Sequence, residues 1–459
     1  MLSDKTIPSI SEAVAAHVAG LRFETLPPGT VHCTRRSLLD TIGVMLGASG
    51  LSEDALPYRA HALAGGPGPA RLLGLSSRVT PVAAALANGA LGHALDYGDT
   101  FDAGPAHPSA ALVPALLALA DADPEIDGGR LIAAMTAGTD LACRLSIAPA
   151  RAYEEGGWYP PPMVGTIATA AACARLLGCG AAGVRDAMGL ALLQSSFPGE
   201  IKYDAGSPIR AVREGWAARA GLEAAQLARA GARAFAAPLE GKAGFFAVYG
   251  GGGPTATLTE GLGERFLGDA VSFKPWPSCR GTHGYIEAAL ALRARIGTRA
   301  IRAIEADTGP IQEMLIHPQA AKAAPGSAIE AKFSIPFAVA HALVRGEVSL
   351  DSFGPAERGD APVLALAALV TEHRRPDWGR EHAASGALTI TLEDGTVLRH
   401  EVSQALGHPD RPLSDAELVE KFLACAAKAA EPLEPRRAEA IARRILTLGP
   451  GTQATALLD

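Results

Sequence analysis

The sequence lacks the features that mark several large classes of protein. Six cysteines in 459 residues, with no CxxC pair, predict reduced thiols in a cytoplasmic location, with neither a disulfide framework nor a cysteine zinc site. Aromatic residues are only 5% of the chain, and the apolar content is mostly Ala, Leu and Val, which favours packed helices over a β-sandwich. The longest apolar run, residues 110–120, is shorter than the ~18 residues of a membrane span, and residues 1–9 do not form a secretion signal.

Charge and motif content exclude further functions. Lys and Arg total 41 against 48 Asp and Glu, giving a net charge of −7, which disfavours nucleic-acid and membrane-surface partners. The chain has no GxSxG, no HExxH and no GxGxxG after a strand, which argues against common hydrolase, zinc and nicotinamide chemistry. What remains is cofactor-free acid–base chemistry on an anionic substrate.

The pattern along the chain predicts a mainly α protein with a smaller α+β part. Residues 1–267 read as helix after helix and form a predicted helical domain. Residues 268–405 contain an alternating run at 300–306 and a hairpin signal at 386–402, with helical patterns at 329–345 and 361–372, which predicts an α+β unit. Residues 406–459 are helical again, as a third unit or as helices that pack back on the first domain.

Residues 91–112, LGHALDYGDTFDAGPAHPSAAL, hold the most informative group of side chains. Asp96, Thr100 and His107 fall within a dozen residues, where a Gly/Pro loop can turn them into one cleft. His107 at the start of a helix is a candidate general base, because the helix dipole favours the neutral imidazole. The alternative is a solvated acidic turn with a capping histidine.

Two cationic groups are candidate carboxylate ligands. Lys274, Cys279 and His283 lie in KPWPSCRGTH (274–283), which is otherwise an interdomain linker. Arg210 and Arg213 lie where a loop enters a helix, and a polar helix start is the alternative there.

Tyr159 precedes three prolines and is a candidate phenolic acid in a rigid loop. An aromatic side chain that packs a turn is the more usual reason for such a residue.

Several segments, in order along most of the chain, resemble the MmgE/PrpD family, which includes 2-methylcitrate dehydratase, cis-aconitate decarboxylase and iminodisuccinate epimerase. The matching stretches are LLDTIGVMLGAS (38–49), ALANGALGHALDYGDTFDAGPAHPSA (85–110), PPPMVGTIATAAACARLLG (160–178), EGWAARAGLEAAQLARAG (214–231), EGKAGFF (240–246), FKPWPSCRGTH (273–283) and AKFSIPFAVAHAL (331–343). The resemblance implies a helical domain built from both chain ends, an α+β lid, an active site in the cleft, a homodimer and no metal. It also implies that Asp96, Thr100 and His107 lie in the catalytic pocket and that Lys274 binds a substrate carboxylate.

The chain departs from the dehydratase and decarboxylase pattern at several positions. Tyr159 stands in place of His, Arg210 and Arg213 in place of a Lys-x-x-His pair, Phe337 in place of Tyr, and Cys279 about where the decarboxylase branch has a second His. Arg for Lys keeps a cationic ligand with another geometry. Tyr for His raises the side-chain pKa from ~6.5 to ~10, which suits a proton donor and not a neutral-pH base.

We therefore expect a cofactor-independent lyase, a dehydratase or decarboxylase, that acts on a small di- or tricarboxylate. His107 is the expected base or acid, Asp96 orients it or binds a hydroxyl, and Tyr159 is the candidate proton donor. Thr100, Arg210, Arg213, Lys274, Cys279 and His283 are the expected substrate ligands. An epimerase of a dicarboxylate such as iminodisuccinate, or a carboxylate-binding member that has lost catalysis, are the alternatives.

Overall fold

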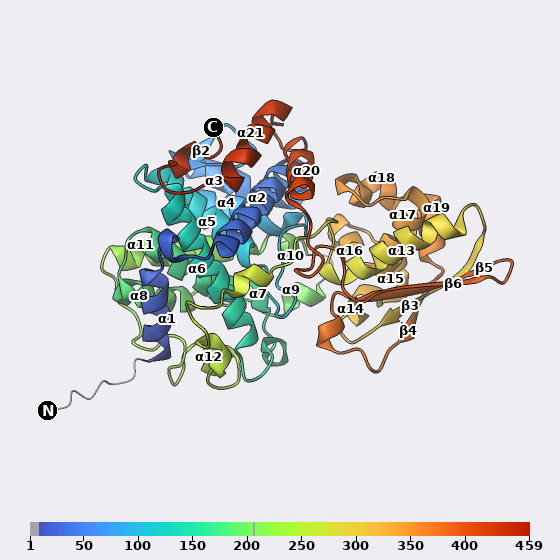
Figure 1. Cartoon of the computed structure of the whole chain (residues 1–459), viewed down its shortest axis with the longest axis horizontal. Helices are drawn as coiled ribbons and strands as arrows, with labels where there is room; N and C mark the ends of the chain where they lie inside the picture. Colours follow the sequence, from blue (N-terminus) through green and yellow to red (C-terminus); the bar gives the residue numbers. More distant parts are fainter. Residues whose placement is uncertain (1–8, 205–206) are drawn as a thin grey trace. The chain divides into compact units, whose positions relative to one another are not determined.

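The computed structural model describes residues 9–204 and 207–459, which form two compact units (Figure 1). The first unit comprises residues 1–271 and 414–459, and the second comprises residues 272–413. The predicted boundaries at 267 and 405 lie four and eight residues before the observed ones. No helix in the described part of the chain has the length and apolar character that a membrane span requires.

The first unit is a bundle of helices that includes both ends of the chain. Its helices and strands are α1 (Ile10–Gly20), α2 (Pro28–Leu51), α3 (Leu56–Ala64), β1 (Pro67–Arg71), β2 (Arg78–Val79), α4 (Pro81–Ala94), α5 (Pro108–Ala122), α6 (Gly128–Ile147), α7 (Pro160–Leu176), α8 (Ala181–Leu192), α9 (Glu200–Tyr203), α10 (Ile209–Val212), α11 (Glu214–Arg229), α12 (Phe245–Tyr249), α20 (Asp415–Ala426) and α21 (Pro435–Leu446). In Figure 1 the C-terminal α20, in red, lies beside α2, in blue, and the two helices pack on each other.

Local sequence explains where these helices begin and how closely they pack. The Thr80 hydroxyl accepts a hydrogen bond from the Ala83 amide and Pro81 fills the first turn, so α4 begins where a cap and a proline predict it. Gly89 on α4 lies so close to Gly215 on α11 that an added Cβ would be 2.8 Å from the Gly215 Cα. Small residues therefore let the helices approach almost backbone to backbone.

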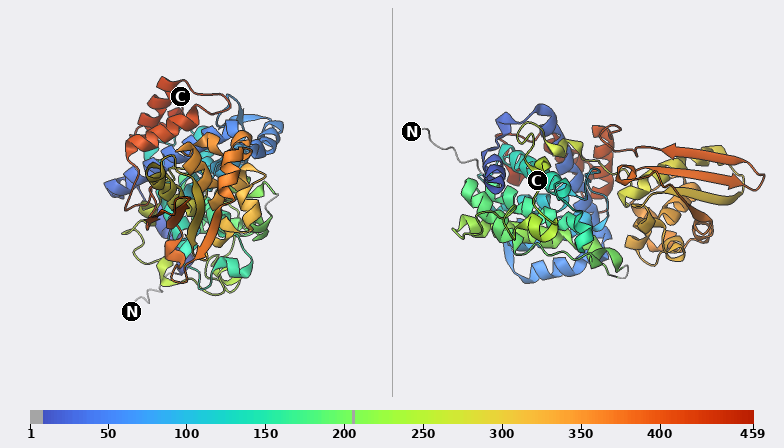
Figure 2. Two further views of the ribbon diagram at one scale, coloured as in Figure 1. Left: turned by 90° about the vertical axis from the view of Figure 1, so that its right-hand side faces the viewer. Right: turned by 90° about the horizontal axis from the view of Figure 1, so that it is seen from below.

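The second unit is a mixed sheet with helices. It contains α13 (His283–Ile296), β3 (Ile301–Thr308), α14 (Glu313–Ile316), α15 (Gln319–Ala323), α16 (Ala328–Lys332), α17 (Ile335–Arg345), α18 (Pro355–Arg358), α19 (Ala361–Ala367), β4 (Val370–Arg374), β5 (Gly386–Leu392) and β6 (Val397–Val402). The strand order is β4-β3-β5-β6, with β3 and β4 parallel and the other pairs antiparallel. The β5–β6 hairpin is seen in Figure 2 (right), and α13 packs on both of its strands.

The expected fold class, mainly α with a smaller α+β part, is confirmed, while three local predictions were wrong. The helix predicted over 361–372 ends at Ala367, and residues 370–374 form the edge strand β4. The helix predicted over 329–345 is interrupted before Ser334, whose hydroxyl caps α17 by accepting from the Phe337 amide at 3.0 Å. The helical unit also contains the short ribbon of β1 and β2, which the sequence pattern did not indicate.

Candidate active site

Three helices of the first unit begin near one another, and α4 ends beside them. Gly92 on α4 packs so closely on α5 that a Cβ added to it would lie 2.3 Å from the Ala110 carbonyl oxygen. A Cβ placed on Gly165 of α7 would lie 3.6 Å from the Ala111 Cβ on α5 and 3.7 Å from the Glu214 Oε2 on α11. The N-termini of α5, α7 and α11 therefore gather at one place, where their dipoles favour an anion.

His107 stands immediately before α5 with its tautomer defined by a neighbour. Its Nδ1 lies 3.0 Å from the carbonyl oxygen of Asp99. Because a carbonyl only accepts, Nδ1 carries the hydrogen, and Nε2 of the neutral imidazole is left as an acceptor. Nε2 is the atom that a general base requires.

Asp96 and His93 lie against His107. The His93 Nε2 is 3.3 Å from the Asp96 Oδ1, and the His93 and His107 ring centroids are 4.4 Å apart. Asp96 has a φ of +49°, a left-handed conformation that Asp tolerates better than most residues and that turns the chain away from the end of α4. The structure thus brings the predicted Asp96 and His107 together and adds His93, which the sequence analysis did not single out.

The rest of the loop is fixed by buried polar contacts. Asp99 accepts hydrogen bonds from the Ser109 hydroxyl at 2.6 Å and amide at 3.3 Å, and burial raises the pKa of the Asp99 carboxyl to about 7. The predicted Thr100 is buried and donates to the Ala106 carbonyl at 3.4 Å. Lys421 from α20 donates to the Tyr97 carbonyl at 2.6 Å, so the C-terminal helices hold this loop in place.

Tyr159 and Arg213 stand immediately before α7 and α11 and contact each other. The Arg213 guanidinium carbon lies 4.9 Å from the centroid of the Tyr159 ring, a cation–π distance. Arg213 is fully buried, its Nη1 donates to the Arg210 carbonyl, and its Nη2 donates to no acceptor within the described residues. An unused donor on a buried cation is costly and is suited to receiving an anionic group.

Glu214, which the sequence analysis missed, lies against Arg213. The Glu214 Oε1 is 3.2 Å from the Arg213 Nε, although the contact lacks hydrogen-bond geometry. Burial raises the pKa of the Glu214 carboxyl to about 7, and the charge of Arg213 opposes that rise. No sequence signal marks Glu214, because a glutamate in the first turn of a helix is ordinary.

The remaining predicted residues lie in the second unit. Lys274 and His283 are fully buried, and the His283 Nε2 is 3.2 Å from the Ser278 carbonyl oxygen. Cys279 is partly exposed, and its amide donates to the Lys332 carbonyl at 3.0 Å, which joins the two family-like motifs of this unit. Their roles as substrate ligands stay predictions.

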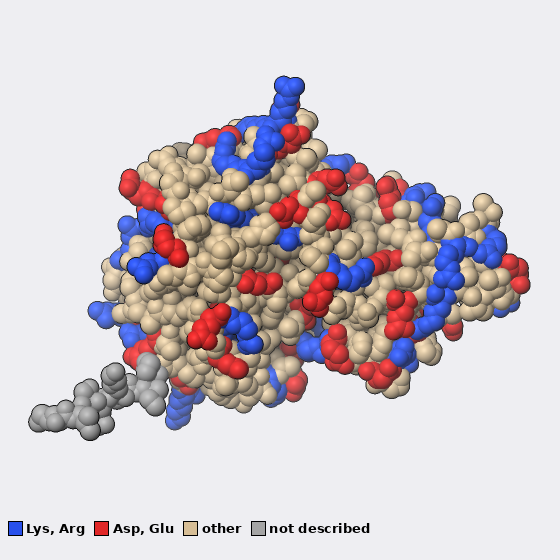
Figure 3. All heavy atoms as spheres, in the orientation of Figure 1, with Lys and Arg blue, Asp and Glu red and all other residues tan. Residues whose placement is uncertain are grey.

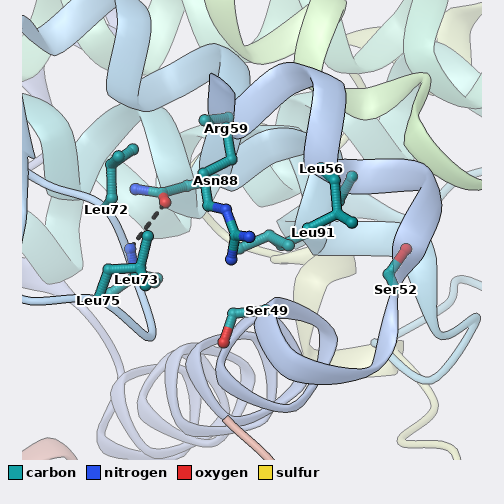
Figure 4. A pocket seen from close by; sticks show the side chains of 11 residues that line it. Ser49, Ser52, Leu56, Arg59, Leu72, Leu73, Leu75, Asn88 and Leu91 are labelled. Carbon is teal, nitrogen blue, oxygen red and sulfur yellow. Dashed lines mark hydrogen bonds between the residues drawn. The ribbon is translucent and has the colours of Figure 1, made fainter. Parts of the chain in front are cut away.

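Figure 3 shows acidic and basic groups mixed over the face that it displays. A hollow lies between α2, α3 and α4 (Figure 4). It is less suited to catalysis than the group around His107, because Arg59 is the one charged residue among those that line it. The Asn88 amide oxygen there already accepts a hydrogen bond from the Leu73 amide at 2.9 Å.

His93, Asp96 and His107 are also of the types that bind metals. One ligand atom from each residue lies within 4.8 Å of the other two, and the His93 Nε2 is 3.3 Å from the Asp96 Oδ1, which is about the separation of two ligands at ~2.0–2.1 Å from one tetrahedral ion. The His107 Nδ1 is already bonded to a carbonyl oxygen, and Asp96 is already close to His93. We propose that the three groups handle protons, and removal of metal ions tests this against the metal-binding alternative.

Chelation tests this assignment directly. If these groups act without a metal, dialysis against EDTA should leave turnover within about twofold of the untreated enzyme. Activity and metal content by mass spectrometry should be measured on the same sample. A loss of activity that Zn²⁺ or Mn²⁺ restores would contradict the assignment.

Comparison with known proteins gives matches over most of the chain. The profile of the MmgE/PrpD N-terminal domain matches residues 12–257, and that of the MmgE/PrpD C-terminal domain matches residues 276–447. The chain is 28% identical to the cis-aconitate decarboxylases of Mus musculus and Homo sapiens, over 92% of this chain and 87% and 88% of the relatives. It is 25% identical to a cis-aconitate decarboxylase-like protein of Aspergillus oryzae, over 96% of this chain and 95% of the relative.

Proposed function

Because the chain belongs to the MmgE/PrpD family, we propose that it is a cofactor-independent lyase acting on a small di- or tricarboxylate. The observation that carries the proposal is the buried Arg213, whose Nη2 has an unused hydrogen-bond donor. Arg213 precedes α11, His107 precedes α5, and these two helices begin close together. A cation for a carboxylate and a base for the neighbouring carbon are the two parts that such a reaction needs. The names of the relatives favour decarboxylation among the lyase reactions.

The residues divide into those that hold the substrate and those that move protons. Arg210 and Arg213 bind carboxylates through their guanidinium groups, and Lys274 is a further cation in the second unit. Their positive charge stabilises the carbanion or enolate that forms next to a carboxylate. The Thr100 hydroxyl, which donates to the Ala106 carbonyl, accepts a hydrogen bond from the substrate, and Cys279 and His283 are proposed as further ligands.

The proton steps use His107 and Tyr159. In dehydration, the His107 Nε2 takes the proton α to a carboxylate, and the hydroxyl group leaves as water with a proton from Tyr159. In decarboxylation, the His107 Nε2 first takes a proton from solvent, CO₂ leaves its bonding electrons on the carbon, and His107 then donates that proton to the carbon. Asp96 faces the imidazoles and stabilises the positive charge that His107 carries between these steps.

A second candidate is an epimerase, favoured by one observation. His107 and Tyr159 precede two different helices, so two separate groups are available to remove a proton from one face of a carbon and return it on the other. An epimerase begins with the same proton abstraction but loses no group.

One experiment tests both candidates. The protein is incubated in deuterated water with a panel of acids, including citrate, 2-methylcitrate, cis-aconitate and iminodisuccinate, and followed by proton NMR. A lyase converts one acid into an alkene or a decarboxylated product, whereas an epimerase incorporates deuterium without forming either. If no acid is converted or exchanged, the proposed function is wrong. The homodimer and the cytoplasmic location expected from the sequence stay predictions.

A further inference from the structure

Glu214 is a buried acid that the proposed reaction does not use. It is the first residue of α11, and only 1% of its surface is exposed. Acids are almost never buried to this extent unless they are paired. The Glu214 side chain is therefore a candidate functional group of the proposed carboxylate-binding site that contains Arg213.

The surroundings of the carboxyl leave Arg213 as its main source of stabilisation. The Oε1 is 3.2 Å from the Arg213 Nε, and the Oε2 would lie 3.7 Å from a Cβ added to Gly165 of α7. Neither oxygen accepts a hydrogen bond within the described part of the chain. An ionised Glu214 thus depends on one cation that is imperfectly aligned with it.

The other titratable groups on the packed elements do not relieve this dependence. They include His93 on α4, His107 before α5, Tyr159 before α7, Arg175 in the last turn of α7 and Asp186 on α8. Among the described residues, Arg213 alone provides a charge that acts on the pKa of Glu214, and burial outweighs it. The carboxyl is consequently poised to change its charge near neutral pH when the charge around Arg213 changes.

We propose that Glu214 takes up one proton when a substrate carboxylate binds to Arg213. The substrate carboxylate then takes the place of the ionised Glu214 as the negative charge beside Arg213. This inference rests on the proposed function, in which Arg213 is a carboxylate ligand. Two carboxylates beside one buried guanidinium repel each other, and protonating the internal one removes that cost. The proton comes from solvent and ends on a Glu214 oxygen, while no other bond is made or broken.

The sign of the pH dependence follows from this exchange. Below the pKa of Glu214, which is about 7, the carboxyl is neutral and the charge of Arg213 is fully available to the ligand. Above it, Glu214 is ionised and competes for Arg213, so affinity falls as pH rises. Linkage of one proton limits the fall to about tenfold in Kd per pH unit.

Isothermal titration calorimetry measures the proton directly. Succinate and tricarballylate serve as unreactive di- and tricarboxylate probes, titrated at pH 8 in phosphate and in Tris, whose ionisation heats differ. The wild-type protein should take up close to one proton per bound probe, seen as a difference between the two observed enthalpies. E214Q, which keeps the shape but not the charge, should bind with no uptake and with a Kd that is flat between pH 6 and 8.

A matched control tests whether proton uptake depends on Glu214 itself or on the loss of any negative charge from α11. Glu223 lies on the same helix, is partly exposed and pairs with Arg219 at 3.7 Å. E223Q also removes one negative charge from α11 and should keep the wild-type proton uptake.

The outcomes distinguish this inference from the proposed function. Binding of either probe without uptake in the wild type, or uptake that persists in E214Q, overturns the inference and leaves the proposed function standing. The wild-type measurement decides the first point even if E214Q does not fold. Absence of binding by both probes at pH 6 overturns the proposed function and the inference together.

Discussion

Replacing His107 by asparagine should lower kcat/KM at least ~100-fold, the usual contribution of a positioned acid–base group. An asparagine amide can still donate to the Asp99 carbonyl that His107 Nδ1 contacts at 3.0 Å, so the loop should keep its conformation. It has no atom that can take a proton in place of Nε2. Steady-state kinetics on the acid that the NMR panel identifies would measure the loss.

The control for His107 is a histidine of the same unit outside the site. His61 lies on α3 with an exposed side chain, and H61N should keep wild-type kinetics. Both variants should keep the wild-type thermal midpoint. Turnover by H107N within a few-fold of wild type would remove His107 from the mechanism.

Replacing Arg144 by methionine should lower the free energy of unfolding by about 3–5 kcal/mol, the effect of breaking a buried ion pair from one side. Arg144 is fully buried on α6, its Nε donates to the Asp140 carboxylate at 2.7 Å, and its Nη atoms donate to carbonyl oxygens of the 257–265 segment. Methionine fills much of the same volume but leaves the Asp140 Oδ2 and these carbonyls without their donor, while the Leu267 amide still donates to the Asp140 Oδ1. Urea unfolding followed by circular dichroism measures the difference.

Two further variants test whether the loss of stability comes from the buried ion pair or from the removal of any arginine. Arg219 makes an exposed pair with Glu223 at 3.7 Å, and R219M should change stability by no more than ~0.5 kcal/mol. Adding D140N to R144M removes the unpaired charge and should recover part of the loss. If R144M were as stable as R219M, the buried network would not stabilise the fold as described.

Helix positions were predictable from sequence where local chemistry determines them. Thr80 with Pro81 marks the start of α4, and the alternation around Asp394 and Gly395 marks the β5–β6 hairpin, because caps and tight turns depend on a few adjacent residues. Strand β4 was missed because its partner β3 lies more than 60 residues earlier in the chain. Pairing over such a distance leaves no periodic signal, and the apolar residues before Val370 continue the helical pattern.

The candidate site was predictable in part for a similar reason. Asp96 and His107 lie eleven residues apart in one loop, so the sequence itself indicated that they meet. Glu214 and His93 were missed because each is an ordinary residue on an Ala-rich helix until neighbouring helices bury it. Burial and the pairing of Arg213 with Glu214 depend on how α4, α5, α7 and α11 come together, which no local pattern records.

The division of the first unit between the two ends of the chain has a consequence for biosynthesis. Gly43 and Gly47 on α2 are covered by Phe422 and Cys425 of α20. Residues 272–413 must leave the ribosome before α20 does, which takes about 7–30 s at ~5–20 residues per second. During that interval an apolar surface of α2 stays open to solvent in the nascent chain, and chaperones are expected to protect it until translation ends.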